Sequence, residues 1–535
     1  MNFKERPQSS QSSKHVNGGI KKMEVVTNVK EKLINFYNKY KVMFIVTIII
    51  GMFAHLFMLT NKLPNHDDIE SIFSKGLTVE IGRWGLDVIK YIFPSYSMPW
   101  FNGIVMIVLI ALSACFVVKI LNLDSKVKQC LIGAIMVTYA SVICTLAYTF
   151  TANAYGVAIL LSVLCVYFAI KPKKTSNVIL SVLCLILSLS IYQAYISLTA
   201  TLFIIVLIKD CLNKNKKAKE VLLKGLRFFG ILIIGVFLYL ASVVIINYAT
   251  GTSLTQYQGA SEIGDISVFS VLQGIVSAYL TIPRLVLRNY YGISAGIILK
   301  IGHVISFIVI AIISIILLKK IFKLSKKKSL LFIILVILLP LCMNLMYLIS
   351  SKVEIHSLMI YGNIFWLILP LVLIEELPKT KFSNCVNNII IITLVIMTYK
   401  YITYANESYF QLKLSYENTQ SFYTTLVTRI ESIPGFDKDT KIAFLGFYGG
   451  ELLYHNSNSF PNMDSFTGIL SNYEMITAYS KENFIKNYIG VDFNYATEEE
   501  INNLKTKNEV QEMELYPYDN SIKKIDDIIV VKFSD

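Results

Sequence analysis

Residues 42–70 read VMFIVTIIIGMFAHLFMLT followed by NKLPNHDDIE, an apolar run that ends in a polar loop with two adjacent acids. The apolar part is long enough to cross a bilayer as a helix, which takes about 20 residues. Similar runs recur to about residue 400, each closed by lysines or a polar loop. The mean hydropathy is +0.57 and 54% of the residues are hydrophobic, more than a soluble chain of 535 residues needs. The pattern predicts a polytopic α-helical membrane protein.

We expect about 11 spans within residues 42–400, because a backbone in lipid must satisfy its own hydrogen bonds as helices. Two longer segments, residues 61–98 and 248–294, lie between spans and are expected on the outer side. The expected spans are about 42–60, 100–118, 130–148, 152–170, 177–191, 194–208, 228–247, 298–318, 329–349, 357–374 and 385–399.

The formal charge of +14 is unevenly distributed along the chain. The segments assigned to the inner side hold 30 Lys/Arg and 8 Asp/Glu, whereas the tail from Lys400 holds 12 Lys/Arg and 20 Asp/Glu. Short basic loops favour the cytoplasmic side, next to anionic lipid head groups. The N-terminus is therefore expected inside and the C-terminus outside, and the basic charge does not indicate a nucleic-acid partner. The inner segments are 1–41, 119–128, 171–174, 209–227, 319–328 and 375–381.

The two ends of the chain differ from the apolar region. Residues 1–41 are polar and basic and are expected to be cytoplasmic and largely disordered. Residues 401–535 are expected to form a small extracytoplasmic α/β domain, because apolar positions there alternate between helical and strand patterns. Its expected elements are a helix at about 405–432, strands at 441–447 and 528–533, and helices near 481–489 and 497–505.

Asp67 and Asp68 follow the first span and are the best candidates for catalysis. A sugar hydroxyl is a poor nucleophile and needs a carboxylate within hydrogen-bond reach to take its proton as it attacks an anomeric carbon. One such base is enough for a single displacement with inversion, and the second carboxylate could bind sugar hydroxyls or a divalent cation. The structural alternative is a capping box that opens a helix, formed by Asp67 with Glu70. The two roles are compatible.

Cations on the outer side are candidates for binding a lipid phosphate. An arginine suits this role because its planar fork pairs with two oxygens. Arg284 and Arg288 would share a helix face, since they are four residues apart. Anchoring to lipid head groups is the alternative. The cationic candidates are Arg83, Arg284, Arg288, Lys352 and His356.

Tyr192, Gln193 and Tyr195 lie at the expected turn between the spans at 177–191 and 194–208. Their hydroxyl and amide groups could bind sugar hydroxyls or the head of a polyprenyl lipid. The alternative is an aromatic belt at the membrane interface.

Three short motifs together resemble the GtrII family of bacterial membrane glucosyltransferases, which belong to the GT-C class. They are NHDD at residues 65–68, GRWG at 82–85 and SLSIYQAY at 188–195. The resemblance extends over about residues 40–400. It implies transfer of glucose from a polyprenyl-phosphate carrier to a cell-surface glycan at the outer face of the bacterial plasma membrane. It also implies a polyprenyl-phosphate glucose synthase and a flippase as partners, and it assigns the acidic pair to Asp67 and Asp68.

The expected function is therefore that of an inverting GT-C glycosyltransferase with a loop-1 aspartate as general base. A transporter or flippase of lipid-linked sugars is one alternative, and it predicts acids inside the spans and two matching halves. The spans are nearly free of acids and no halves match. A polysaccharide polymerase or ligase is the other alternative, and its site would be expected on a large later loop.

Overall fold

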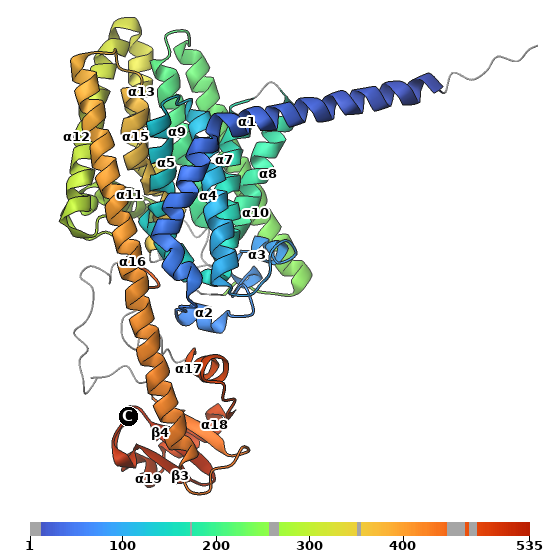
Figure 1. Cartoon of the computed structure of the whole chain (residues 1–535), viewed down its shortest axis with the longest axis vertical. Helices are drawn as coiled ribbons and strands as arrows, with labels where there is room; N and C mark the ends of the chain where they lie inside the picture. The colour runs from blue at the N-terminus through green and yellow to red at the C-terminus, as the bar shows by residue number, and fades with distance from the viewer. Residues whose placement is uncertain are drawn as a thin grey trace, which may run out of the picture.

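The computed structural model of the chain, shown in Figure 1, describes residues 12–171, 174–255, 267–349, 355–446, 466–469 and 479–534. Most helices form one bundle, and a single long helix, α16 (Lys381–Glu431), runs from the bundle to a small sheet formed by the C-terminal residues (Figure 1).

Among the described residues, nine helices are long and apolar enough to cross a membrane, or ten if one bent pair counts as a span. The predicted class, a multi-pass helical membrane protein, is confirmed. The nine are Lys30–Thr60 of α1 (Ser12–Thr60), α4 (Pro99–Leu121), α7 (Thr149–Ala169), η2 with α9 (Gln193–Leu212), α10 (Ala218–Thr250), α11 (Val268–Leu287), α12 (Gly296–Leu324), η4 (Ser357–Ile364) with α15 (Phe365–Ile374), and α16. The remaining helices of the bundle are the bent pair α5 (Lys126–Thr138) and α6 (Ala140–Ala147), and α8 (Thr175–Ile191), α13 (Lys326–Met343) and α14 (Met346–Ile349).

The segment at 248–294 is more than the outer loop that the sequence predicts, because it contains the 20-residue helix α11. Gly274, Ala278, Thr281 and Leu285 form its buried face, and exposed apolar side chains cover much of the rest. The sequence places Arg284 and Arg288 on one helix face, but it does not predict a helix long and apolar enough to cross a membrane here. At the other end of the chain, α1 begins at Ser12, so residues 12–41, expected to be largely disordered, are described as helix.

The centre of the bundle is the span formed by η4 and α15, which is buried along its whole length. By contrast, only 22% of the apolar windows of α10 and α11 are buried. A helix that is apolar all round is stable only inside a protein or in lipid. The η4–α15 span therefore forms the protein core, and α10 and α11 present apolar faces to the surrounding bilayer.

The bent pair is broken at Tyr139, whose extended backbone separates α5 from α6 at an angle of 40°. A break frees carbonyl groups, which must find partners because lipid offers none. The Tyr361 hydroxyl donates to the Met136 carbonyl at 2.8 Å, and Nε2 of His55 donates to the Val137 carbonyl at 2.8 Å. Side chains of two other spans therefore stabilise the break.

The C-terminal residues form a four-stranded sheet in the order β2-β1-β4-β3. Both strands predicted from the sequence are present, as β1 (Lys441–Leu445) and β4 (Ile528–Lys532), which pair in parallel. β3 (Ile522–Ile525) and β4 form a hairpin whose two turn residues both have positive φ, as a type I′ turn requires. The other elements are β2 (Asn494–Tyr495), α17 (Lys481–Phe484), the π-helical turn η7 (Ile485–Ile489), α18 (Glu498–Lys505), α19 (Asn508–Gln511) and the 3-10 turn η8 (Asp519–Ser521).

One boundary predicted from the sequence changes in this region, and one predicted helix is present as expected. The expected helix at 405–432 and the expected last span are one continuous helix, α16, so no break separates the membrane region from the tail at residue 400. The expected helix at 497–505 is present as α18, and Thr497 and Glu500 form a capping box at its N-terminus. The Gly446 turn after β1 is described only to that residue, and residues 447–450 lie outside the described ranges.

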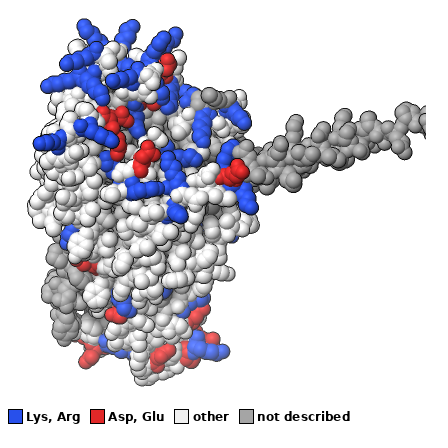
Figure 2. All heavy atoms as spheres, turned by 45° about the horizontal axis from the view of Figure 1, so that its top comes forward, with Lys and Arg blue, Asp and Glu red and all other residues white. Residues whose placement is uncertain are grey.

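Charged side chains are segregated on the surface. Figure 2 shows Lys and Arg gathered at one end of the bundle, above a belt that is almost free of charge. Lys319, Lys320 and Lys323 of α12 lie at this end, together with Lys214 from the turn between α9 and α10. This is the end opposite the C-terminal sheet (Figure 1).

Candidate active site

The segment after the first span folds over the other end of the bundle as three short helices: α2 (His66–Glu70), η1 (Val79–Ile81) and α3 (Gly85–Ile89). The buried side chain of Asn65 begins α2, because its Oδ1 accepts the Asp68 N–H at 2.9 Å. Its amide group donates to the Ala147 carbonyl at 3.1 Å, which fixes α2 to the end of α6. A helix was predicted here, but its cap is Asn65 rather than Asp67.

Asp67 and Asp68 lie in different surroundings. The Asp68 carboxylate is fully buried and contacts the Lys62 ammonium and the Ser97 hydroxyl. It also accepts the Phe150 N–H at 3.2 Å. Asp67 remains 30% exposed and lines a cavity. Only Asp67 is therefore placed to meet a substrate.

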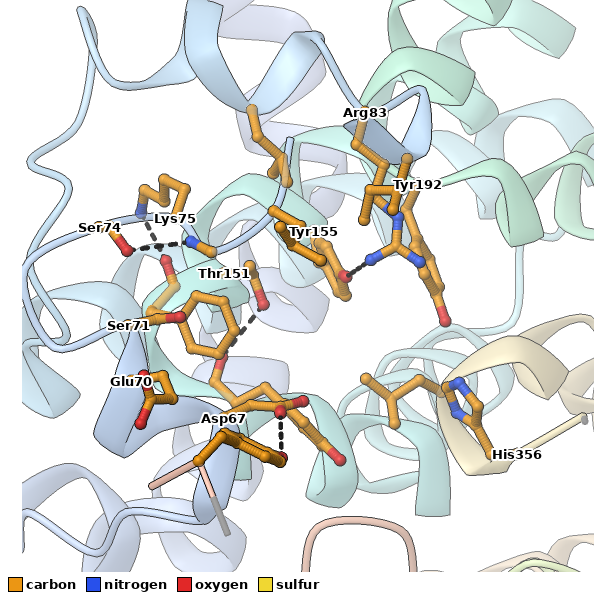
Figure 3. A pocket seen from close by; sticks show the side chains of 18 residues that line it. Asp67, Glu70, Ser71, Ser74, Lys75, Arg83, Thr151, Tyr155, Tyr192 and His356 are labelled. Carbon is orange, nitrogen blue, oxygen red and sulfur yellow. Dashed lines mark hydrogen bonds between the residues drawn. The ribbon is translucent and has the colours of Figure 1, made fainter. Parts of the chain in front are cut away.

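The cavity has a volume of about 510 Å3, and side chains from the three short helices and the loops between them line it (Figure 3). Its walls carry carboxylates, cations, hydroxyls and aromatic rings, a mixture suited to a polar ligand with a charged group. The lining residues with polar side chains are Asp67, Glu70, Ser71, Ser74, Lys75, Arg83, Tyr148, Thr151, Tyr155, Tyr192, His356 and Tyr479.

Arg83 is the most firmly held cation in this cavity. Its Nη1 donates to the Tyr155 hydroxyl at 3.2 Å and its Nε donates to Oε1 of Gln193 at 3.3 Å. The guanidinium lies 4.9 Å from the centroid of the Tyr192 ring, a cation–π contact. These three neighbours fix the guanidinium at the cavity wall.

The motif at residues 82–85 meets the motif at residues 188–195, although about 100 residues separate them in the sequence. A side chain at Gly85 would begin only 2.3 Å from the Ser190 hydroxyl and 2.9 Å from the Ser190 backbone, so this close approach requires glycine. Gln193 extends the contact, because its amide group donates to the Ile81 carbonyl at 3.1 Å and to the Tyr239 hydroxyl at 2.9 Å. The two motifs build the support of Arg83.

Lys75 and Glu70 also line the cavity. Lys75 was not singled out from the sequence, and Glu70 was considered only as part of a capping box. The Lys75 ammonium is buried and donates to the Phe150 carbonyl at 2.7 Å and to Oδ1 of Asn153 at 2.9 Å. Burial lowers the pKa of Lys75 to about 8. Burial also raises the pKa of the Glu70 carboxyl.

His356 lies across the cavity from Asp67 (Figure 3). Burial, and next the positive charge of Arg83, lower the pKa of His356 to about 4. Its imidazole is therefore neutral at physiological pH. Within the described ranges its buried Nδ1 has no hydrogen-bond partner, which leaves this atom for a ligand.

The other residues singled out from the sequence lie away from the cavity lining or behind it. Gln193 positions Arg83, and Tyr195 is buried edge-on against Tyr155 and Tyr192. Arg284 contacts the Tyr347 hydroxyl at 3.4 Å, Arg288 is exposed at the end of α11, and neither lines the cavity. Lys352 lies outside the described residues.

The described part of the chain contains no group of three or more His, Cys, Asp or Glu side chains that could hold a metal ion. Asp68, one of the two residues considered for a divalent cation, already faces the Lys62 ammonium. The residues present therefore do not fit a cation shared by Asp67 and Asp68, and no step below depends on one.

The spans and the cavity lined by Asp67 and Arg83 define a multi-pass membrane protein with a candidate site for a polar ligand. Comparison with known families makes the assignment specific. The chain belongs to the glucosyl transferase GtrII family, whose pattern matches residues 56–367, more than half of its length. The predicted resemblance is thus confirmed, and membership indicates a glucosyltransferase. No curated protein and no solved structure matches the chain.

Proposed function

We propose that the protein is a GT-C glycosyltransferase that moves glucose from a polyprenyl-phosphate carrier to a cell-surface glycan, with inversion at the anomeric carbon. The observation that carries this proposal is the cavity in which the partly exposed Asp67 and the firmly held Arg83 line the same space. A carboxylate and a guanidinium in one cavity match the two needs of the reaction, a base for the acceptor and a cation for the leaving phosphate.

Arg83 would hold the phosphate of the donor. Its Tyr155, Gln193 and Tyr192 contacts orient the guanidinium before the ligand arrives, so little reorganisation is needed during the reaction. Nδ1 of the neutral His356 is a second group for the donor. With the proton on Nε2, it would accept a hydrogen bond from a hydroxyl of the sugar.

Asp67 would act as the general base. The acceptor hydroxyl attacks C1 of glucose, the bond from C1 to the phosphate oxygen breaks with inversion, and the proton of the hydroxyl passes to the Asp67 carboxylate. Polyprenyl phosphate leaves with the bonding electron pair. Asp68 has no direct part in this step, because the Lys62 ammonium and the Phe150 amide occupy its carboxylate.

The reaction would take place at the outer face of a bacterial plasma membrane. The lysine-rich end of the bundle favours the cytoplasm, and the cavity lies towards the opposite end, with the C-terminal sheet. A polyprenyl-phosphate glucose synthase would make the donor inside, and a flippase would present it outside. The lipid tail would remain in the bilayer beside the bundle.

The test is transfer of radiolabelled glucose from polyprenyl-phosphate glucose to isolated cell envelope by the purified chain in lipid vesicles. Wild-type protein should transfer label. Arg83→Lys should raise the KM for the donor about 10-fold, because lysine cannot make the bidentate contact of a guanidinium with two phosphate oxygens. Arg284→Lys is the matched control and should leave this KM unchanged. An unchanged donor KM in Arg83→Lys would show that another group binds the phosphate.

A further inference from the structure

The C-terminal residues contribute directly to the wall of the cavity. Tyr479 lines it and donates its hydroxyl proton to Oδ1 of Asp67 at 3.2 Å, across 412 positions of sequence. Its ring also lies edge-on to His66, with centroids 6.1 Å apart. Asn483, one turn further, donates its amide to Oε2 of Glu70 at 2.8 Å. Both carboxylates on the α2 side of the cavity therefore have a partner from the C-terminal region.

A second C-terminal segment, residues 466–469, reaches the opposite wall. The Ser357 N–H donates to Oγ1 of Thr467 at 3.1 Å, and the Thr467 N–H donates to Oγ of Ser357 at 3.3 Å. Phe466 and Ile469 on either side are 2% and 4% exposed. Ser357 directly follows His356, so this contact fixes the backbone next to the imidazole.

The same segment also touches the α2 side. Gly468 has φ of +82°, and a side chain there would begin 2.5 Å from the Tyr148 ring and 3.1 Å from the Asn65 amide nitrogen. Asn65 is the cap of the helix that carries Asp67. Residues 466–469 therefore connect the wall that holds His356 with the wall that holds Asp67.

The contacts from Tyr479 and Asn483 rest on a rigid support. Phe484 of α17 is buried against Tyr423 and Tyr416 of α16, with ring centroids 5.2 and 6.2 Å apart. Because α16 is one continuous helix from the bundle to the sheet, it holds α17 at a fixed position relative to the bundle.

We infer that the C-terminal region is part of the active site and that Tyr479 is a positioning residue for Asp67. The hydroxyl of Tyr479 holds one carboxylate oxygen, which leaves the other oxygen directed at the acceptor hydroxyl. The inference rests on the proposed role of Asp67 as base. The C-terminal region would then orient the general base, in addition to any part in binding the glycan.

The test compares Tyr479→Phe with wild type, Asp67→Asn and Tyr495→Phe, all as the full chain in vesicles with polyprenyl-phosphate glucose and cell envelope. Tyr495→Phe is the matched control, because its hydroxyl is buried with no hydrogen-bond partner among the described residues. Tyr479→Phe should lower kcat about 10-fold, because a less well aligned base costs rate. The KM for the donor should not change, since the Arg83 contacts are intact. Tyr495→Phe should match wild type in both values.

The outcomes separate this inference from the proposed function. Loss of transfer in Asp67→Asn with wild-type kcat in Tyr479→Phe would overturn the inference alone. A raised donor KM and a lower melting temperature in Tyr479→Phe would also overturn it, since they would assign Tyr479 a role in stability only. Full activity in Asp67→Asn, or no transfer by wild type, would overturn the proposed function and this inference with it.

Discussion

Asp67 and Asp68 are neighbours in sequence, yet helix α2 directs one into a cavity and the other into the protein. Asp68 lies in a closed set of donors that includes the Lys62 ammonium and the Phe150 amide. Asp67 is 30% exposed, and its Oδ1 lies 3.4 Å from Nε2 of His66 and accepts the Tyr479 hydroxyl at 3.2 Å. Asp68 is therefore a structural residue and Asp67 is the candidate base, because the two side chains differ in burial and in their partners although both are aspartates.

Asp68→Asn should destabilise the folded protein by about 3 kcal/mol, because removal of one partner leaves a partly buried ammonium without its counter-charge. Thermal unfolding in detergent micelles measures this. Asp67→Asn, at the exposed neighbour, serves as the control and should unfold within a few degrees of wild type. Equal melting temperatures for Asp68→Asn and wild type would argue against a structural role for this carboxylate.

Lys75 predicts a pH dependence of stability. Burial lowers its pKa from 10.5 to about 8, so between pH 8 and 10.5 the unfolded chain binds a proton that the folded chain has released. The free energy of unfolding of wild type, relative to Lys75→Met, should therefore rise with pH across this window, by up to about 3 kcal/mol. Chemical unfolding of both proteins at several pH values measures the difference. If the difference in free energy of unfolding between wild type and Lys75→Met stayed constant with pH, the pKa of Lys75 would not be lowered in the folded protein.

The site residues divide clearly into those that sequence can indicate and those that it cannot. Asp67, Arg83, Tyr192 and His356 were predicted, because acids, cations and tyrosines at span ends are unusual enough to be noticed. Lys75 is a single lysine in a polar loop, and only its burial between α7 and the loop makes it notable. Tyr479 belongs to the cavity through tertiary contacts that no local pattern encodes.

At the scale of elements, the break between α5 and α6 shows how the bundle tolerates an interrupted span. His55 and Tyr361 supply the hydrogen bonds that the broken helix lacks. Since Nε2 of His55 donates to a carbonyl, its Nδ1 accepts the proton of the Tyr409 hydroxyl at 2.9 Å. This role could not be predicted, because a lone histidine in an apolar run gives no indication of its partner.

Tyr361→Phe should destabilise the protein by about 1–3 kcal/mol, because the Met136 carbonyl would be buried without a donor. Tyr399→Phe is the control, since that side chain is 62% exposed on α16. Thermal unfolding in micelles compares the two variants. A melting temperature of Tyr361→Phe equal to that of Tyr399→Phe and of wild type would show that the hydroxyl of Tyr361 does not support the break.

The spans themselves were largely predictable, because apolar runs of sufficient length have few alternatives in a bilayer. Helix α11 was not predicted as a span, since its segment begins polar and its apolar residues are shared between a protein face and an outer face. Helix α16 was divided in two for a related reason. Its character changes from apolar to amphipathic near residue 400, while the backbone continues unchanged.

At the scale of the whole molecule, charge and shape favour one orientation. The lysine-rich end and the C-terminal sheet lie at opposite ends of the spans. Short basic loops favour the cytoplasmic side, so the cavity and the sheet are expected to face outward.

Cysteine labelling tests this orientation. In a Cys385→Ser background, which removes an exposed native thiol, Asn503→Cys on α18 should react with a membrane-impermeant maleimide in intact cells. Lys323→Cys on α12 should react only after the cells are permeabilised. Labelling of position 323 in intact cells and protection of position 503 would reverse the proposed orientation.

The most direct measurement of the central claim is glucose transfer by Asp67→Asn, compared with wild type at equal amounts of folded protein in vesicles. The substitution keeps the size of the side chain and removes its ability to take a proton. We expect the rate of transfer from polyprenyl-phosphate glucose to fall at least about 100-fold, the usual contribution of a general base. A rate within a few-fold of wild type would contradict the assignment of Asp67 as the base that activates the acceptor.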